Sequence, residues 1–149
     1  CQFGLMFLAD PSAGLREMAR VGARGAVAVW DSIERSDGYS AMQEFFGDEL
    51  GEEAATSLDA PFAMGAPGAL ERIVDDAGLT RVEFTSVQGS GRFDSIEQWV
   101  TTEIRGWTLG DRVSEAQLEG LVEVAATRLA EFGSPDGCGF GMAARVVTW

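Results

Sequence analysis

The stretch GAVAVW, residues 25–30, decides the fold that this sequence predicts. Its residues are glycine, alanine, valine and tryptophan, and no charged or hydroxyl side chain interrupts the run. An unbroken apolar run of this length is typical of a strand that is buried on both faces within a parallel sheet. We therefore expect a buried strand here and an α/β fold built around it.

A short amphipathic helix is predicted just before this strand. Asp10 is suited to cap the helix, Pro11 to be its first residue, and Gly22 to end it. Leu15 and Met18 then share one apolar face. A helix that leads directly into a buried strand is half of a βαβ repeat, which agrees with a parallel sheet.

The middle of the chain predicts helices followed by a second strand. Helical pieces at residues 41–46 and 52–58 are separated by Gly47 and Gly51, and we interpret residues 31–62 as a helical insertion over the sheet. Residues 66–79 follow with an amphipathic helical pattern that ends at Gly78. The alternation in TRVEFTSVQ, residues 80–88, predicts a half-exposed strand near a sheet edge.

Two capping boxes predict two further helices. Asp94 precedes Glu97 by three residues, and Ser114 precedes Gln117 by three. The first of these helices would carry one stripe of residues: Ile96, Trp99, Val100, Glu103, Ile104 and Trp107. The segment GCGFGMAARVVTW, residues 137–149, then predicts a last strand.

Two glycine strings invite comparison with phosphate-binding loops. GSG, residues 89–91, follows a strand but lacks the spacing of a dinucleotide fingerprint, so we interpret it as a turn. GCGFG, residues 137–141, contains no lysine for a phosphate, and we interpret it as a loop that enters the last strand.

Composition restricts the kind of partner. The chain has 149 residues, which fits one domain over residues 1–149, and 24 acidic residues against 11 arginines give a net charge of −13. Such a charge repels a polyphosphate, so we expect no nucleic-acid partner and interpret the acidic surface as a solubility feature. No apolar run approaches 18 residues, so we expect no membrane span.

The absence of histidine restricts the chemistry. Without it, neither a Cys–His nucleophile nor a Ser–His–Asp triad can be built. The two cysteines, Cys1 and Cys138, lie at opposite ends of the chain without metal-ligand spacing, so we expect no metal site. This cysteine usage and the absence of a basic leader favour the cytoplasm.

Four segments carry a resemblance to a known family: CQFGLMFLADPSAGLREMARV (residues 1–21), GAVAVWDS (25–32), ALERIVDDAGLTRVEF (69–84) and RFDSIEQWVTTEIRGWTL (92–109). Together they resemble the C-terminal half of a class I S-adenosylmethionine-dependent methyltransferase. The later segments look like the small-molecule subgroup similar to the ubiquinone/menaquinone type. The family's corner before the fifth strand is usually Pro-Gly-Gly, whereas VGARGAV here keeps Gly22 and Gly25 without the proline.

The resemblance implies a partial Rossmann-like fold, a three-stranded remnant of a mixed sheet flanked by helices. Cys1 would lie at the end of the family's fourth strand. The glycine-rich motif and the ribose-binding acidic residue would then lie upstream of residue 1. We therefore expect a truncated methyltransferase for a small molecule, inactive as this fragment and unable to bind S-adenosylmethionine tightly.

The resemblance also implies site residues, although it assigns no catalytic residue. The cofactor would contact Cys1, Gln2, Phe3 and Gly4, because ligands of open α/β sheets lie beyond the carboxyl ends of the strands. The methyl acceptor would contact Met6, Phe7, Trp30, Arg105 and Trp107. Asp31 could border the same pocket. The alternatives are core packing for Trp30, a solvent-facing side chain for Arg105 and simple apolar packing for Trp107.

A rival interpretation is a self-standing acidic α+β module that mediates dimerisation or binds a small ligand without catalysis. Under the methyltransferase interpretation, the GAVAVW strand would keep one edge without a neighbour, which favours a homodimer through residues 1–30. The alternative to this dimer is a monomer whose own N-terminal residues fold back over that edge.

Overall fold

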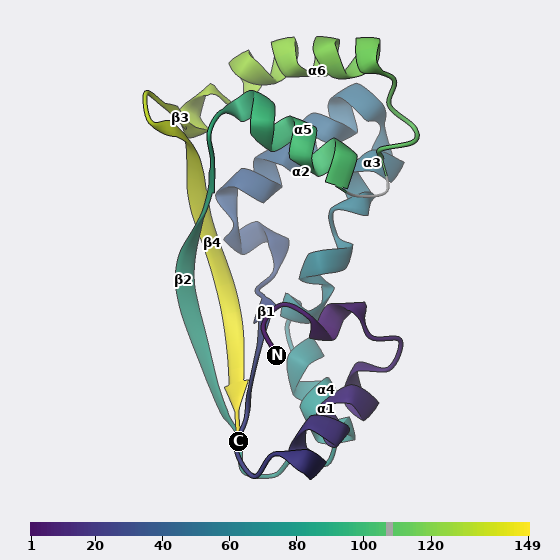
Figure 1. Cartoon of the computed structure of the whole chain (residues 1–149), viewed down its shortest axis with the longest axis vertical. Helices are drawn as coiled ribbons and strands as arrows, with labels where there is room; N and C mark the ends of the chain where they lie inside the picture. Colours follow the sequence, from purple (N-terminus) through teal and green to yellow (C-terminus); the bar gives the residue numbers. More distant parts are fainter. Residues whose placement is uncertain (107–108) are drawn as a thin grey trace. The chain divides into compact units, whose positions relative to one another are not determined.

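The chain forms two compact units. A computed structural model describes residues 1–106 and 109–149. Unit 1 comprises Cys1–Ser36, Asp59–Gly89 and Met142–Trp149, and unit 2 comprises Asp37–Leu58 and Ser90–Gly141. Two long strands, β2 (Glu83–Phe93) and β4 (Gly137–Thr148), contribute residues to both units (Figure 1).

The strands form an open antiparallel sheet. Its order is β1 (Ala26–Trp30), β4, β2, and the two-residue strand β3 (Gly133–Ser134) also pairs with β4. The register between β1 and β4 places Ala26 opposite Thr148 and Trp30 opposite Ala144. The fold is therefore mixed α/β, but the expected three-stranded mixed sheet is corrected to four antiparallel strands.

The strand at GAVAVW forms, but it is not buried on both faces. Val27 and Val29 are fully buried, whereas Ala26 is exposed and Ala28 and Trp30 are half-buried. The covered face therefore alternates with a less covered one, as in an antiparallel sheet. The sequence pattern misled here because alanine is apolar yet tolerates exposure.

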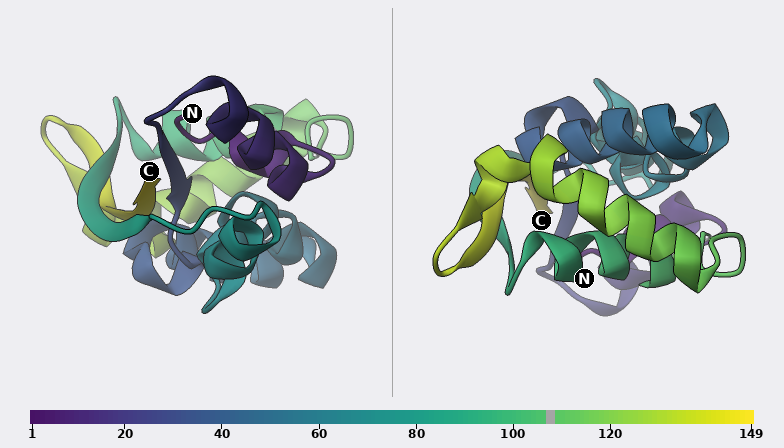
Figure 2. Two further views of the ribbon diagram at one scale, coloured as in Figure 1. Left: turned by 90° about the horizontal axis from the view of Figure 1, so that it is seen from below. Right: turned by 90° about the horizontal axis from the view of Figure 1, so that it is seen from above.

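Helices cover the valine face of β1 within unit 1. They are η1 (Leu5–Phe7), α1 (Pro11–Val21), η3 (Ala60–Gly65) and α4 (Ala69–Asp76), and the short helix η2 (Ile33–Arg35) follows β1 in the chain. Figure 2 shows α1 and α4 side by side, which agrees with their contacts. The core that they enclose contains Leu5, Leu15, Val27, Val29, Met64, Leu70, Val74, Ala77 and Val147.

The predicted boundaries of α1 and the predicted end of α4 are confirmed, but α4 begins at Ala69 rather than at residue 66. The Asp10 carboxylate accepts a hydrogen bond from the Ala13 amide at 2.8 Å, and α1 ends at Gly22. After α4, Gly78 has a φ of 77°, a left-handed conformation that glycine adopts without strain.

Unit 2 contains α2 (Asp37–Leu50), α3 (Glu52–Ser57), α5 (Ile96–Gly106), α6 (Glu115–Arg128) and η4 (Ala130–Phe132). Helices α5 and α6 pack side by side (Figure 2). An aromatic cluster fills the core beneath them, in which the rings of Trp99 and Phe140 lie 4.4 Å apart. The cluster also includes Tyr39, Phe93 and Phe132.

Local signals in unit 2 are confirmed in part. Ser114 and Gln117 form the predicted capping box of α6. At α5 the box is displaced by one residue, because the Gln98 amide donates to Ser95 Oγ at 3.0 Å and Gln98 Oε1 accepts from the Asp94 amide. Helix α2 continues through Gly47, and the predicted break occurs only at Gly51.

Both glycine strings lie within strands, so their interpretation as a turn and a loop was wrong. Residues 89–91 belong to β2, and residues 137–141 belong to β4. A Cβ atom on Gly91 would lie 2.5 Å from the Phe140 ring, so this strand needs a residue without a side chain there. No helix among the described residues is both long and apolar enough to cross a membrane.

Candidate functional site at the carboxyl end of β1

The first residues of the chain pair with β1 in parallel. Gln2 forms an isolated parallel bridge with Ala28. The Ala28 amide donates to the Cys1 carbonyl at 2.9 Å, and the Phe3 amide donates to the Ala28 carbonyl at 2.9 Å. The N-terminal ammonium also donates to the Ala26 carbonyl. The chain's own N-terminus therefore occupies part of the β1 edge, as the fold-back alternative expects.

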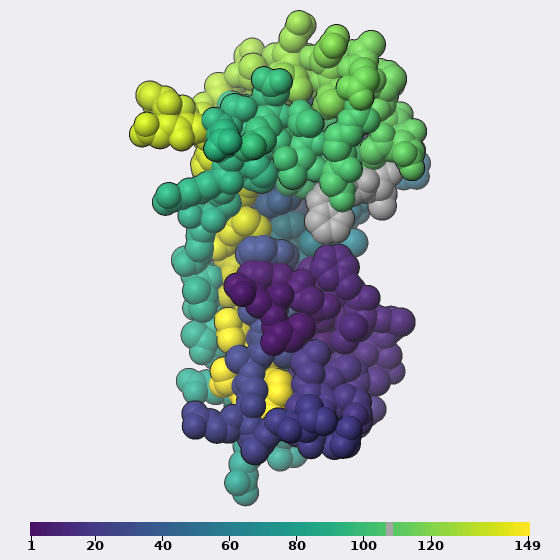
Figure 3. All heavy atoms as spheres, viewed as in Figure 1, coloured from purple at the N-terminus to yellow at the C-terminus, as the bar shows by residue number. Residues whose placement is uncertain are grey.

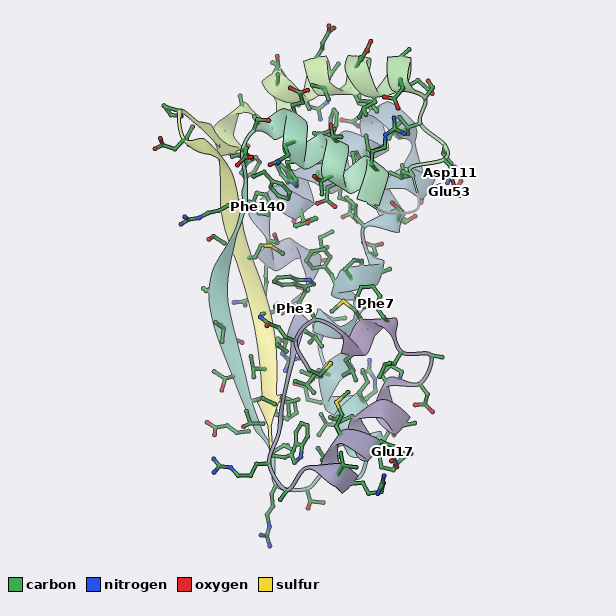
Figure 4. The ribbon with its side chains drawn as sticks, viewed as in Figure 1. Phe3, Phe7, Glu17, Glu53, Asp111 and Phe140 are labelled. Carbon is green, nitrogen blue, oxygen red and sulfur yellow. The ribbon has the colours of Figure 1, made fainter. Side chains whose placement is uncertain are left out.

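Phe3 and Trp30 form a stacked aromatic pair at the end of this parallel pairing. Their ring centroids lie 3.7 Å apart with an interplanar angle of 12°. Phe3 has a φ of 52°, the single positive φ of a non-glycine residue in the described part of the chain. Figure 4 labels Phe3 beside β1. A strained backbone at such a position requires compensating contacts, and the stacked indole supplies one.

Asp31 follows Trp30 and is almost completely buried. Its amide donates to the Ala143 carbonyl at 3.0 Å, and one carboxylate oxygen lies 3.1 Å from the Arg35 Nε. The other carboxylate oxygen accepts from the Ser32 amide at 2.9 Å. Gly65 packs directly against the Asp31 backbone, because a Cβ atom there would lie 2.1 Å from its carbonyl carbon. The turn after β1 is therefore fixed from several sides.

The other residues predicted for the acceptor in unit 1 differ in exposure. Met6 is half-buried and packs against the core of unit 1. Phe7 is 66% exposed, and Leu8 beside it is 40% exposed. Figure 3 shows the N-terminal residues on the surface of the viewed face. Exposed Cys1 and Gln2 and half-buried Gly4 leave this backbone accessible to a ligand.

A small cleft lies beside the turn that follows β1. Its volume is about 300 Å³, and it is lined by Ser32, Ile33, Glu34, Asp59, Phe62, Ala63, Ala66 and Pro67. The Glu34 pKa lies below its usual value because backbone and Ser32 hydrogen bonds stabilise the carboxylate. Acidic groups on this cleft disfavour an anionic ligand at that position.

The described residues do not form a metal site. No group of three or more histidine, cysteine or carboxylate residues is arranged to hold a metal ion in residues 1–106 and 109–149. What the carboxyl end of β1 provides is an accessible backbone, a stacked aromatic pair and a buried carboxylate. This arrangement can position a flat or apolar molecule through contact area rather than through charge.

Two of the predicted acceptor residues lie elsewhere or outside the described chain. Arg105 belongs to unit 2, where its guanidinium donates to the carbonyls of Gly110 and Val113 at 3.0 and 3.1 Å. It also pairs with Glu115 at 2.5 Å. Arg105 therefore fixes residues 110–115 against the end of α5, an arrangement that sequence reasoning missed. Trp107 lies outside the described residues.

A buried polar pair in unit 2 also escaped sequence reasoning. The Tyr39 hydroxyl donates to Glu103 Oε1 at 2.7 Å, and Glu103 is 2% exposed. Burial, together with the Glu103 carboxylate, raises the Tyr39 pKa far above its usual range. A carboxylate within the apolar stripe of α5 was the signal for this burial, but nothing local pointed to Tyr39 as its partner.

Comparisons with known proteins do not extend these observations. No protein-family model matches the chain, and no curated protein matches it significantly. The geometry of the chain itself therefore carries the functional argument.

Proposed function

We propose that this chain is the C-terminal part of a class I S-adenosylmethionine-dependent methyltransferase that acts on a small molecule. The observation that carries the proposal is the parallel pairing of Gln2 with Ala28 beside the antiparallel neighbour β4. The family resemblance implies that the fourth strand flanks GAVAVW, and residues 1–3 occupy that position. The pairing supports a Rossmann-like arrangement, in which residues 1–3 are the end of that strand.

The proposed ligand positions follow from this pairing. Ligands of open α/β sheets lie beyond the carboxyl ends of parallel strands, which is where Phe3 and Trp30 stack. The backbone of Cys1, Gln2, Phe3 and Gly4 would face the methionine end of the cofactor. Trp30, Met6 and Phe7 would border the methyl acceptor.

The bound cofactor would supply a methyl group on a positively charged sulfur. The residues described here would contribute by orientation, because holding two reactants in line provides a large part of the acceleration in such transfers. The Phe3–Trp30 pair would present a flat apolar surface, and the buried Asp31 carboxylate would keep the turn that carries Trp30 in place. No general base is assigned.

The proposal places the cofactor-binding half of the enzyme before residue 1, so this chain alone would bind S-adenosylmethionine weakly. Calorimetric titration of the chain with S-adenosylmethionine tests this part. We expect no saturation at micromolar concentrations, and a dissociation constant in the low micromolar range would contradict the truncation.

The positive test uses a longer polypeptide in which a cofactor-binding half precedes this chain. There we expect Met6→Ala to raise the apparent KM for the acceptor and to leave cofactor affinity nearly unchanged. Phe3→Ala should weaken cofactor binding, since its backbone segment would line the cofactor. Equal loss of cofactor affinity in the Met6 variant would remove that residue from the acceptor site.

The rival function, an acidic α+β module without catalysis, is favoured by two observations. All four named strands pair antiparallel, and the N-terminus itself occupies part of the β1 edge. The longer polypeptide separates the two proposals, because a module would gain no S-adenosylmethionine affinity from a preceding half.

Two further features belong to the methyltransferase proposal. We place the enzyme in the cytoplasm, because a reducing compartment keeps thiols such as Cys1 and Cys138 in the free form that the structure shows. We also retain a homodimer whose contact lies in residues 1–30. The exposed apolar side chains of Phe7 and Leu8 support this contact. The β1 edge supports it less, because residues 1–3 of the same chain already occupy part of that edge.

A further inference from the structure

The two outer strands of the sheet differ in how their free edges are covered. Beside β1, the backbone of residues 1–3 pairs in parallel and occupies part of that edge. The central strand β4 has a neighbour on each side, and just after it Trp149 exchanges two backbone hydrogen bonds with Gly25 and donates from its indole to the Gly22 carbonyl. Strand β2 is the other outer strand (Figure 1), and among the described residues only β4 pairs with it.

Strand β2 lacks the features that usually block further pairing at a sheet edge. Soluble proteins protect their edge strands with lysine or proline residues, with bulges or with short strand length. β2 has 11 residues and no proline, and its segment FTSVQGSG, residues 84–91, carries no charge. Every residue from Glu83 to Ser90 is exposed. The outer edge of β2 can therefore receive another strand.

Two opposite charges restrict which strand fits this edge. Glu83 and Arg92 are the only charged residues of β2, and neither forms an ion pair in the part of the chain that the structure describes. They lie nine positions apart, so their side chains belong to opposite faces of the sheet. Residues directly opposite each other in neighbouring strands share a face. A complementary strand must therefore place its own two charges on opposite faces as well.

A second copy of this chain does not meet that requirement. Antiparallel pairing about a two-fold axis keeps every residue on its own face, so the partner of Glu83 would lie an even number of positions from it in the sequence. Arg92 lies nine positions away and is therefore excluded as that partner. The charge pattern favours a different polypeptide as the occupant of this edge.

We propose that β2 is an interaction surface that takes up an extended segment of another protein as an antiparallel strand. The segment would carry an acidic residue opposite Arg92 and, nine positions later, a basic residue opposite Glu83, with uncharged residues between them. Backbone hydrogen bonds along the edge would supply most of the affinity, and the two charges would fix the register. Antiparallel addition continues the pairing of the four named strands.

Fluorescence anisotropy with the labelled peptide Glu-Thr-Val-Thr-Ser-Val-Thr-Val-Thr-Lys tests the proposal. The control peptide exchanges only the last two residues, which keeps the composition but moves the lysine to the other face. We expect the first peptide to bind with a dissociation constant below about 1 mM, and the control to bind about threefold more weakly. Equal affinities would overturn the register, and the absence of binding at millimolar peptide would overturn the surface.

Exchange of the two charges on the protein provides a second test. The double variant Glu83→Arg with Arg92→Glu should bind the first peptide about tenfold more weakly. It should regain affinity for a peptide whose glutamate and lysine are exchanged. Arg24→Glu with Glu131→Arg is the matched control, because both positions are exposed, both lie outside β2 and the net charge is again unchanged. Equal weakening by this control would overturn the assignment of the charges.

Amide hydrogen exchange locates the bound peptide. We expect the first peptide to slow exchange in residues 83–92, because the outward N–H groups of β2 would gain hydrogen-bond acceptors. Protection confined to another segment would overturn the surface. Protection of residues 83–92 that develops without peptide, as the protein concentration is raised, would show that a second copy occupies the edge and would overturn the proposed partner.

Discussion

The rings of Phe3 and Trp30 stack with their centroids 3.7 Å apart, and each ring belongs to one of two segments that pair in parallel. We expect the two rings to stabilise the fold cooperatively. A double-mutant cycle with Phe3→Leu and Trp30→Leu should give a coupling energy of about 1 kcal/mol, measured by urea unfolding. Strictly additive effects would show that the stack contributes nothing to stability.

Gly65 is expected to tolerate no side chain. Gly65→Ala would place a methyl group 2.1 Å from the Asp31 carbonyl carbon, so the backbone must shift, at a cost of about 1–3 kcal/mol or more. Gly120→Ala is the matched control, because it lies within α6 with no atom near its Cβ position and should stabilise by about 0.5–1 kcal/mol. Thermal unfolding of both variants measures these changes in stability. An unchanged stability of Gly65→Ala would contradict the close approach of Gly65 to the Asp31 backbone.

Tyr39 is the single tyrosine of the chain, so the absorbance of phenolate reports on it alone. Its pKa is raised in the folded state, first by burial and then by Glu103. The stabilisation linked to this shift is therefore fully present below the usual pKa of 10.0 and is lost as pH rises. We expect no phenolate until alkaline unfolding begins. Titration of the folded protein near pH 10.0 would contradict the buried pair, and the unfolded chain in urea serves as control.

Glu71 and Arg145 form a bidentate ion pair between α4 and β4. The pair lowers the Glu71 pKa, so its contribution is present above the usual value of 4.5 and is lost as pH falls through the folded-state pKa. Because Glu71 is 42% exposed, we expect Glu71→Gln to cost less than about 1 kcal/mol at neutral pH, and nothing in acid. Urea unfolding at neutral pH and in acid measures both changes. Glu17→Gln, in a more exposed ion pair, should cost nothing measurable at either pH. An effect of Glu71→Gln that grows in acid would contradict this assignment.

Self-association through residues 1–30 should depend on Phe7, whose side chain is 66% exposed. We expect sedimentation equilibrium to show a dimer that Phe7→Ser converts to monomer, because a hydroxyl replaces the apolar contact. Val87→Ser, at a 47% exposed position on β2, should leave the dimer intact. A wild-type chain that stays monomeric at high micromolar concentration would remove the dimer from the proposal.

The sequence predicted the elements whose signals are local. Helix α1 follows from Asp10 and Gly22, and α6 follows from the capping box of Ser114 and Gln117. Strand direction was missed, because it depends on pairing β1 with residues near position 146, and no local pattern encodes that partner. The length of β2 was missed because Gly91 serves to admit the Phe140 ring rather than to form a turn.

The position of the candidate site was predictable from the sequence, but its contacts were not. The end of β1 was located from the GAVAVW run, which drew attention to Trp30 and Asp31. Their contacts with Phe3 and Gly65 could not be foreseen, since these residues come from distant segments. Likewise, the hydrogen bond between Tyr39 and Glu103 joins residues 64 positions apart. The sequence placed Glu103 in the helical stripe, but it did not identify Tyr39 as its hydrogen-bond partner.

The hydrogen bond from Trp149 to Gly22 joins residues 127 positions apart, and β4 supplies Val147 to the core around Val27. During synthesis on the ribosome, α1 and β1 emerge long before the strand that completes their core. Unit 1 therefore cannot reach its final packing until nearly the whole chain has been translated, and closing so long a loop slows folding. Until then the apolar side chains of β1 stay exposed to chaperones and to other unfolded chains. This strand is therefore the segment most prone to aggregation during synthesis.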